Sequence, residues 1–193
     1  MLAFNSLICF PAFIVAGYFV FGQRVPYSFD PKDIPDSLTL FLQCLFCMLM
    51  EDIVFHISHR FLHWKVIYPY IHKLHHSYTT TVGIAAEYSH PIEYILGNVL
   101  ASSMGVIILD RHVHITTSIV WGLIRIFETT DGHCGYEFSW SPFRLLPFGT
   151  SATYHDFHHS HNVGNYSSFF SIWDTIFGSN RVYYKYQQER EEK

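Results

Sequence analysis

Histidine is the residue type in this 193-residue sequence that could do chemistry, because its 14 copies are gathered rather than scattered. Five lie between positions 59 and 76, and four lie between 155 and 161. Eight of these nine fall into one H-x-x-x-H box and two H-x-x-H-H boxes: His59 and His63; His72, His75 and His76; His155, His158 and His159. The same spacing occurring twice predicts a shared function for the boxes.

Residues three or four apart on a helix are neighbours, so the imidazoles of one box can reach one metal ion. A zinc ion takes at most four ligands, and a single non-haem iron needs two histidines and a carboxylate. Eight imidazoles therefore favour two metal ions, although imidazole alone does not distinguish iron from zinc, copper or nickel. The aromatic surroundings, including Phe157, Tyr166, Phe169 and Trp173, favour a redox di-iron site that attacks a lipid C–H bond over a hydrolytic zinc site.

Four apolar runs must position these boxes: residues 2–22, 38–58, 92–109 and 114–127. The first has no charge and about the length of a membrane span. The second contains Glu51, Asp52 and His56, and charges inside a span are costly and usually functional. The fourth run is short for a membrane crossing, so it either tilts in the membrane or packs inside the bundle. We predict an all-α, integral membrane helical bundle of about four transmembrane helices with a histidine-rich helical cap.

Charge indicates where such a bundle would lie. Charged residues make up 15% of the chain, against about a quarter in soluble domains. The net charge of -4 excludes nucleic acid as a partner. Four crossings would place 9 of the 12 Lys and Arg residues on the side of the boxes, so the positive-inside rule predicts that this side is cytoplasmic. His112 and His114, which follow the third run, would then lie on the opposite side.

The three boxes resemble those of the fatty acid hydroxylase superfamily, over about residues 48–178. Flanking motifs resemble its sterol C-4 methyl oxidase (methylsterol monooxygenase) branch: E-Y-S-H-P-I-E at 87–93, R-I-F-E-T-T-D-G-H-C-G-Y at 125–136, R-L-L-P-F at 144–148 and G-N-Y-S-S-F-F-S-I-W-D at 164–174. The resemblance divides the chain into an N-terminal membrane segment and loop (1–47), a di-iron domain (48–180) and a polar tail (181–193).

This resemblance implies a monooxygenase of the endoplasmic reticulum membrane that holds two iron ions and uses O2. It implies electrons from NAD(P)H through cytochrome b5 or a reductase, and the chain has no G-x-G-x-x-G nucleotide fingerprint of its own. The eight box histidines carry over as ligands, and His133 matches a further family histidine. His90 is a weaker candidate ligand, and His161 a weaker one still.

Carboxylates beside ligating histidines usually fix the ring tautomer. The candidates for this role are Asp52, Asp131, Asp156, Glu87 and Glu93. Asn165 and Tyr166 follow the third box and are candidates to line the substrate entrance.

Three functions remain open on the sequence. The first is oxidation of a sterol C-4 methyl group in sterol biosynthesis. The second is a hydroxylase, desaturase or side-chain-removing enzyme that acts at another sterol position or on a fatty acyl chain. The third is a metal transporter, which would place ionisable groups near the bilayer midplane, whereas the boxes lie outside the apolar runs.

Overall fold

The computed structural model describes residues 1–192. The helices are α1 (Leu2–Phe4), α2 (Phe10–Val20), α3 (Ser37–Leu62), α4 (Pro91–Glu93), α5 (Ala101–Leu109), α6 (Ile115–Gly132), α7 (Ala152–His161), α8 (Ile172–Phe177) and α9 (Arg181–Glu191). Wider helical turns at Asn5–Cys9 and Tyr94–Leu100 join α1 to α2 and α4 to α5 into two long rods. Extended pairing over residues 1–192 is limited to two isolated bridges, so the predicted all-α class is confirmed.

Within residues 1–192, three stretches are long and apolar enough to cross a membrane: Leu2–Val20, Ser37–Leu62 and Pro91–His112. The fourth predicted run lies in α6, whose outer face exposes Ile119, Leu123 and Phe127. Its inner face carries the buried Arg125 and Glu128. The charged inner face explains why the apolar run is short in the sequence, although its helix packs alongside the others.

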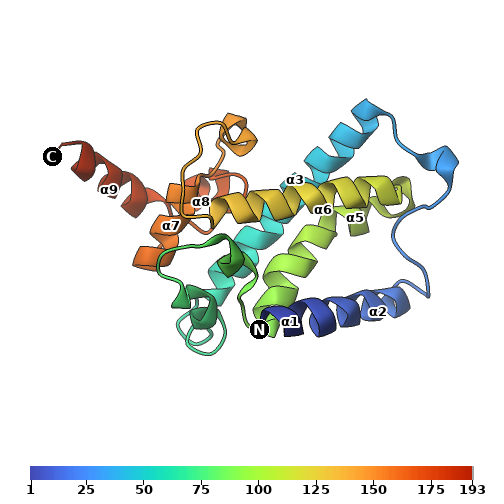
Figure 1. Ribbon diagram of the computed structural model, residues 1–193, viewed down its shortest axis with the longest axis horizontal. Coiled ribbons are helices and arrows are strands. Elements are labelled where there is room, and N and C mark those ends of the chain that lie inside the picture. Colours follow the sequence, from blue (N-terminus) through green and yellow to red (C-terminus); the bar gives the residue numbers. More distant parts are fainter. Residues whose placement is uncertain (193) are drawn as a thin grey trace.

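The rods α1–α2, α3, α4–α5 and α6 run between two ends of the molecule (Figure 1). One end holds the loop 21–36 and the turn 110–114, which pair through the Ser28 amide and the Val113 carbonyl at 2.8 Å. The other end holds the segment 63–90 and helices α7, α8 and α9. The four rods therefore present every histidine box at one end.

Helix ends follow ordinary capping chemistry. Asp36 begins α3 by accepting from the Thr39 amide at 2.8 Å, and Ser151 begins α7 by accepting from the Tyr154 amide at 3.0 Å. Asn162 ends α7 in the left-handed region at φ 54°. The caps at Ser151 and Asn162 fix the bounds of the helix that carries the third box.

The core joins α3, α5 and α6. Cys47 on α3 and Trp121 on α6 are buried in it, and the Trp121 indole donates to the Ser102 carbonyl at 2.7 Å. The helices α3 and α5 approach closely, because a Cβ atom added at Gly105 would lie 2.5 Å from the Cys47 Cα. This packing sets the position of the α3 end that carries the first box.

Candidate metal centre

Nine histidines converge into two groups, and within each group the ligand nitrogens lie within 4.8 Å of one another. Group one contains His59, His63, His72, His76 and His158. Group two contains His75, His133, His155 and His159. All are buried except the half-buried His63. The structure thus brings together the eight box histidines and His133 from four different segments.

Each of the two H-x-x-H-H boxes contributes histidines to both groups, and the two boxes do so in opposite ways. In the box 72–76 the outer histidines enter group one and His75 enters group two. In the box 155–159 the outer histidines enter group two and His158 enters group one. Adjacent residues point about 100° apart on an α-helix such as α7 and about 120° apart on the tighter helical turn His72–Ser77, so the two neighbouring histidines that end each box face different centres. The repeated H-x-x-H-H spacing therefore lets each box supply ligands to two adjacent sites.

Six of the nine rings are oriented through Nδ1, and five of these donate Nδ1–H to a backbone carbonyl. The acceptors are Tyr166 for His59, Tyr88 for His75, Thr129 for His133, Gly164 for His158 and Tyr78 for His159. A ring nitrogen that faces a carbonyl oxygen must carry the proton. Each Nε2 is therefore left with a free lone pair, which faces the centre of its group.

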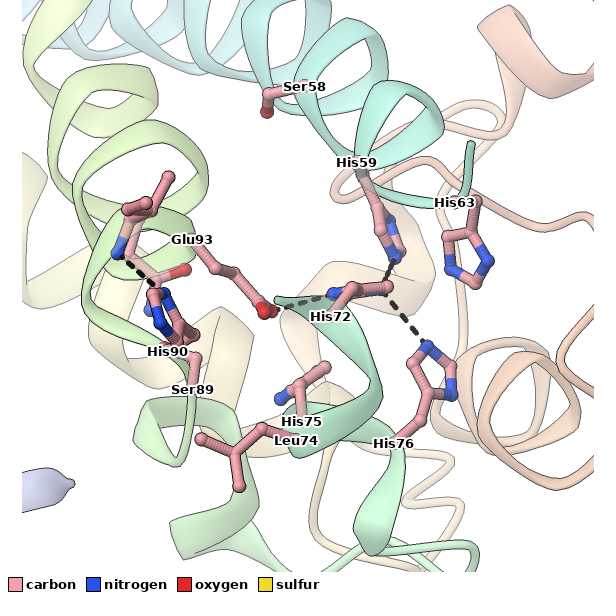
Figure 2. Close-up of polar contacts among 12 residues, drawn as sticks. Ser58, His59, His63, His72, Leu74, His75, His76, Ser89, His90 and Glu93 are labelled. Carbon is pink, nitrogen blue, oxygen red and sulfur yellow. Dashed lines mark hydrogen bonds and ion pairs between the residues drawn. The ribbon is translucent and has the colours of Figure 1, made fainter. Parts of the chain in front are cut away.

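The sixth ring, His72, is oriented by a carboxylate. Its Nδ1 lies 2.8 Å from Glu93 Oε1. Figure 2 shows the Glu93 side chain pointing at the His72 ring, whose other nitrogen faces His59 and His76. Glu93 lies in the short helix α4 and its carboxylate is buried. Such a carboxylate fixes the tautomer and raises the basicity of the ligand nitrogen.

The spacing of the Nε2 atoms fits metal ions. His59 Nδ1 faces the Tyr166 carbonyl and His72 Nδ1 faces the Glu93 carboxylate, yet the Nε2 atoms of the two rings lie only 3.1 Å apart. Two lone pairs facing each other at that distance repel unless a cation lies between them. Nitrogens bound at about 2.1 Å and at right angles to each other would be about 3.0 Å apart, which matches this pair. The donor set therefore suits cations with more than four ligands.

Burial keeps these rings in the form that binds metal. It lowers the pKa of His75 to about 3 and that of His159 to about 4. Both imidazoles are neutral at physiological pH, and a metal ion needs the neutral ring.

Two of the carboxylates expected to orient histidines accept hydrogen bonds from backbone amides instead. Asp52 accepts from the Phe170 amide at 3.1 Å, and Asp156 accepts from the Thr81 amide at 3.2 Å. Both contacts tie loops against the helices that carry the boxes. Within residues 1–192 neither carboxylate forms an ion pair with a box histidine.

Three further candidates also lie away from the two groups. Asp131 forms an ion pair with Arg144 at 2.7 Å and so fastens the loop after α6. Glu87 lines an apolar cavity. His90 caps α4, where its Nδ1 accepts from the Ile92 amide at 3.2 Å, so its ring is already engaged (Figure 2).

Asn165 and Tyr166, predicted to line the entrance, have different surroundings. Asn165 is fully buried and donates to the Tyr154 carbonyl at 2.9 Å. Tyr166 supplies the carbonyl that orients His59, and its ring lies 5.0 Å from the His63 ring. Asn165 therefore holds the backbone of Tyr154 in place, whereas the Tyr166 ring packs against the histidines of group one.

The remaining histidines lie outside both groups. His161 is exposed and stacks on Phe157 at 4.1 Å between ring centres. His112 and His114 lie in the turn before α6, at the other end of the molecule. This matches their predicted separation from the metal-binding end.

Sequence reasoning did not single out Asp174. Its buried carboxylate accepts from the Tyr154 hydroxyl at 2.8 Å and from the amides of Tyr166 and Ser167 at 3.0 and 2.9 Å. It therefore holds the segment whose carbonyls orient His59 and His158. The only signal in the sequence is the final Asp of the motif G-N-Y-S-S-F-F-S-I-W-D.

Comparison with known proteins agrees with this arrangement. Methylsterol monooxygenase 1 of Gallus gallus is 38% identical over 93% of this chain and 60% of its own length. Methylsterol monooxygenase 1 of Danio rerio is 37% identical over 96% and 62%, and methylsterol monooxygenase erg25B of Aspergillus fumigatus is 38% identical over 93% and 59%. The chain thus spans about 60% of the length of these relatives.

No solved structure matches the chain significantly. The family model for fatty acid hydroxylase matches residues 44–179, which include every histidine of groups one and two. The chain therefore belongs to the fatty acid hydroxylase family.

Proposed function

We propose that this chain is a membrane di-iron oxidoreductase that hydroxylates a C-4 methyl group of a sterol. One oxygen atom of O2 enters the C–H bond, and the other leaves as water after taking up two electrons and two protons. The electrons come from NAD(P)H through a partner, cytochrome b5 or a reductase. The observation that carries the proposal is the convergence of nine histidines whose ring nitrogens form two adjacent groups, each with its ligand atoms within 4.8 Å of one another.

The substrate class rests on similarity, since the three relatives described above are all named methylsterol monooxygenases. Groups one and two would hold the two iron ions, which would supply the activation of O2. The residues of the chain keep the rings neutral and exclude water by burial. The Nδ1 contacts hold each ring in one orientation, so that the metal-facing nitrogens need not reorganise during the reaction.

We further propose an endoplasmic reticulum membrane location with the histidine end in the cytoplasm. The three apolar stretches support the membrane. Eight of the nine histidines lie outside these stretches, and His59 lies in the last turn of Ser37–Leu62. A position at one end disfavours a metal transit path, which would need sites near the midplane. A cytoplasmic histidine end would also let a soluble electron donor approach.

The test begins with protein purified anaerobically in detergent. We expect about two iron ions per chain by elemental analysis, and formation of 4-hydroxymethyl sterol from 4,4-dimethylsterol. NADPH and O2 alone should give no product, and adding microsomal electron carriers should start turnover. A chain that binds one iron ion or none would contradict the di-iron proposal, and product oxidised at another carbon would change the assigned position.

The ligand assignment is tested by complementing a strain deficient in sterol C-4 oxidation. His76→Ala in group one and His159→Ala in group two should each abolish product while the protein still inserts, because each opens one coordination sphere. His112→Gln and His161→Gln are matched controls outside both groups and should keep most of the activity. Full activity of either alanine variant, with expression checked by blot, would remove that residue from the ligand set.

A further inference from the structure

A cavity of about 630 Å³ lies between α2, α5 and α6. This volume falls within the range of about 300–1,000 Å³ that is typical of small-molecule sites. Its walls are mostly apolar, with Phe10 and Ile14 from α2 and Trp121 and Ile126 from α6. Ile14 and Ile126 also keep 49% and 59% of their surface exposed. The cavity therefore opens on the apolar outer face of the helices, where a lipid can enter.

The inner end of this cavity reaches the metal centre. Asn98, Arg125 and Thr129 line the large cavity and also a small second one. The small cavity is bounded by histidines of both groups, including His72 and His133. The three shared residues form the wall between the apolar cavity and the proposed iron site.

Glu87 is the distinctive polar group at this inner end. It lines the large cavity, and within residues 1–192 its carboxylate has neither a hydrogen bond nor an ion pair. Burial raises its pKa. The next residue, Tyr88, supplies the carbonyl that faces His75 Nδ1 at 3.4 Å. Within residues 1–192, a carboxylate that is free to hydrogen-bond therefore stands at the metal end of the cavity, near the polar groups Asn98, Arg125 and Thr129 of the shared wall.

We infer that this cavity binds the sterol lengthwise, with the ring that carries the 3-hydroxyl group inward, and that Glu87 hydrogen-bonds to that hydroxyl. This inference rests on the proposed function. C-4 is bonded directly to C-3, so anchoring the 3-hydroxyl group beside Tyr88 brings the C-4 methyl group to the wall shared with the metal centre. The apolar rings and side chain then fill the part of the cavity between α2 and α6.

The cavity is tested by filling it. A Cβ atom added at Gly122 meets nothing within 4 Å, and Gly122 lines the cavity, so the Gly122→Phe side chain can enter the cavity, and thermal unfolding checks that the variant is folded. Binding of tritiated 4,4-dimethylsterol to the metal-loaded protein should weaken by about tenfold or more, as overfilling a packed space does. The matched control is Leu123→Phe, at the neighbouring position on the exposed face, which should bind as the wild type does. Wild-type binding by Gly122→Phe would overturn the cavity assignment.

The orientation is tested at Glu87 with two ligands. Glu87→Leu should weaken binding of the 3-hydroxy sterol by about tenfold, the value of one hydrogen bond to a charged group. It should leave binding of the 3-deoxy sterol unchanged, and Glu87→Gln should restore most of the lost affinity. Equal losses for the two ligands, or no loss for either, would overturn the role of Glu87.

Binding and turnover separate this inference from the proposed function. If the wild type oxidises the sterol while Gly122→Phe binds and turns over normally, the cavity assignment fails and the proposed function stands. If the wild type binds the sterol in a Gly122-dependent way without oxidising it, the cavity assignment stands and the proposed function fails.

Discussion

Glu93 is the one predicted carboxylate that reaches a box histidine within residues 1–192, and its bond to His72 can be tested directly. We expect Glu93→Leu to lower metal affinity by about 10–100-fold, the usual cost of removing a carboxylate that orients a ligand. Glu93→Gln should fall between Glu93→Leu and the wild type, because its amide oxygen can lie against His72 Nδ1 but carries no negative charge. The measurement is a competition titration of the purified protein with a chelator of known affinity.

The control for this experiment is Asp156→Asn, whose side chain contacts the Thr81 amide instead of a box histidine. Its metal affinity should stay close to that of the wild type. Loss of affinity in Asp156→Asn as large as in Glu93→Leu would mean that general loosening of the fold, and not the His72 contact, is responsible.

At the residue scale, the sequence predicts the metal-facing side chains better than their supports. Histidine spacing identifies the boxes because i, i+3 and i, i+4 neighbours share a helix face. It cannot identify the carbonyls of Tyr78 or Tyr88, because every residue carries a carbonyl and only the folded loop aims it. Asp52 likewise carries the right chemistry, but the Phe170 amide takes its oxygen.

Among the elements, the crossing of α3 and α5 limits residue size at Gly105, where an added Cβ atom would lie 2.5 Å from the Cys47 backbone. We expect Gly105→Leu to destabilise the protein by about 1–3 kcal/mol, as overpacking of a core does. Thermal unfolding in detergent measures this. Gly122→Ala is the control, since nothing lies within 4 Å of its added Cβ atom. An unchanged unfolding temperature for Gly105→Leu would contradict the close packing.

Apolar runs in the sequence locate the helices well, but they do not reveal their local form. The run 92–109 is one apolar stretch in the sequence, interrupted only by Glu93, whereas the structure begins it with α4 and a wider turn at Tyr94–Leu100. The second box forms a tight turn, His72–Ser77, rather than part of a long helix. Both departures depend on tertiary contacts, such as that between Glu93 and His72, that join segments distant in the chain.

For the whole molecule, burying so many neutral imidazoles makes the stability of the metal-free protein depend on pH. His75 and His159 have an ordinary pKa of 6.5, which burial lowers to about 3 and about 4. Between pH 6.5 and 4 the unfolded chain binds protons that the folded chain does not, so stability falls as the pH falls. Above pH 6.5 neither state is protonated at these rings, and they add no pH dependence.

Thermal unfolding of the chelator-treated protein at pH 7.5, 6.5, 5.5 and 4.5 checks this expectation. The unfolding temperature should fall steadily below pH 6.5. Replacing the exposed His161 by Gln should leave the curve unchanged. Greater stability at pH 5.5 than at pH 7.5 would show that the rings are protonated in the folded state.

Because most Nδ1 atoms around the centre donate to peptide carbonyls, point substitutions in the loops that supply those carbonyls can leave the orienting bonds in place. Changing the side chain of Tyr78 or Tyr88 leaves its carbonyl oxygen in the chain. Inserting or deleting one residue there would instead move the carbonyl away from its histidine and let the ring turn. We therefore expect the loops around the centre to tolerate side-chain substitutions but not insertions or deletions.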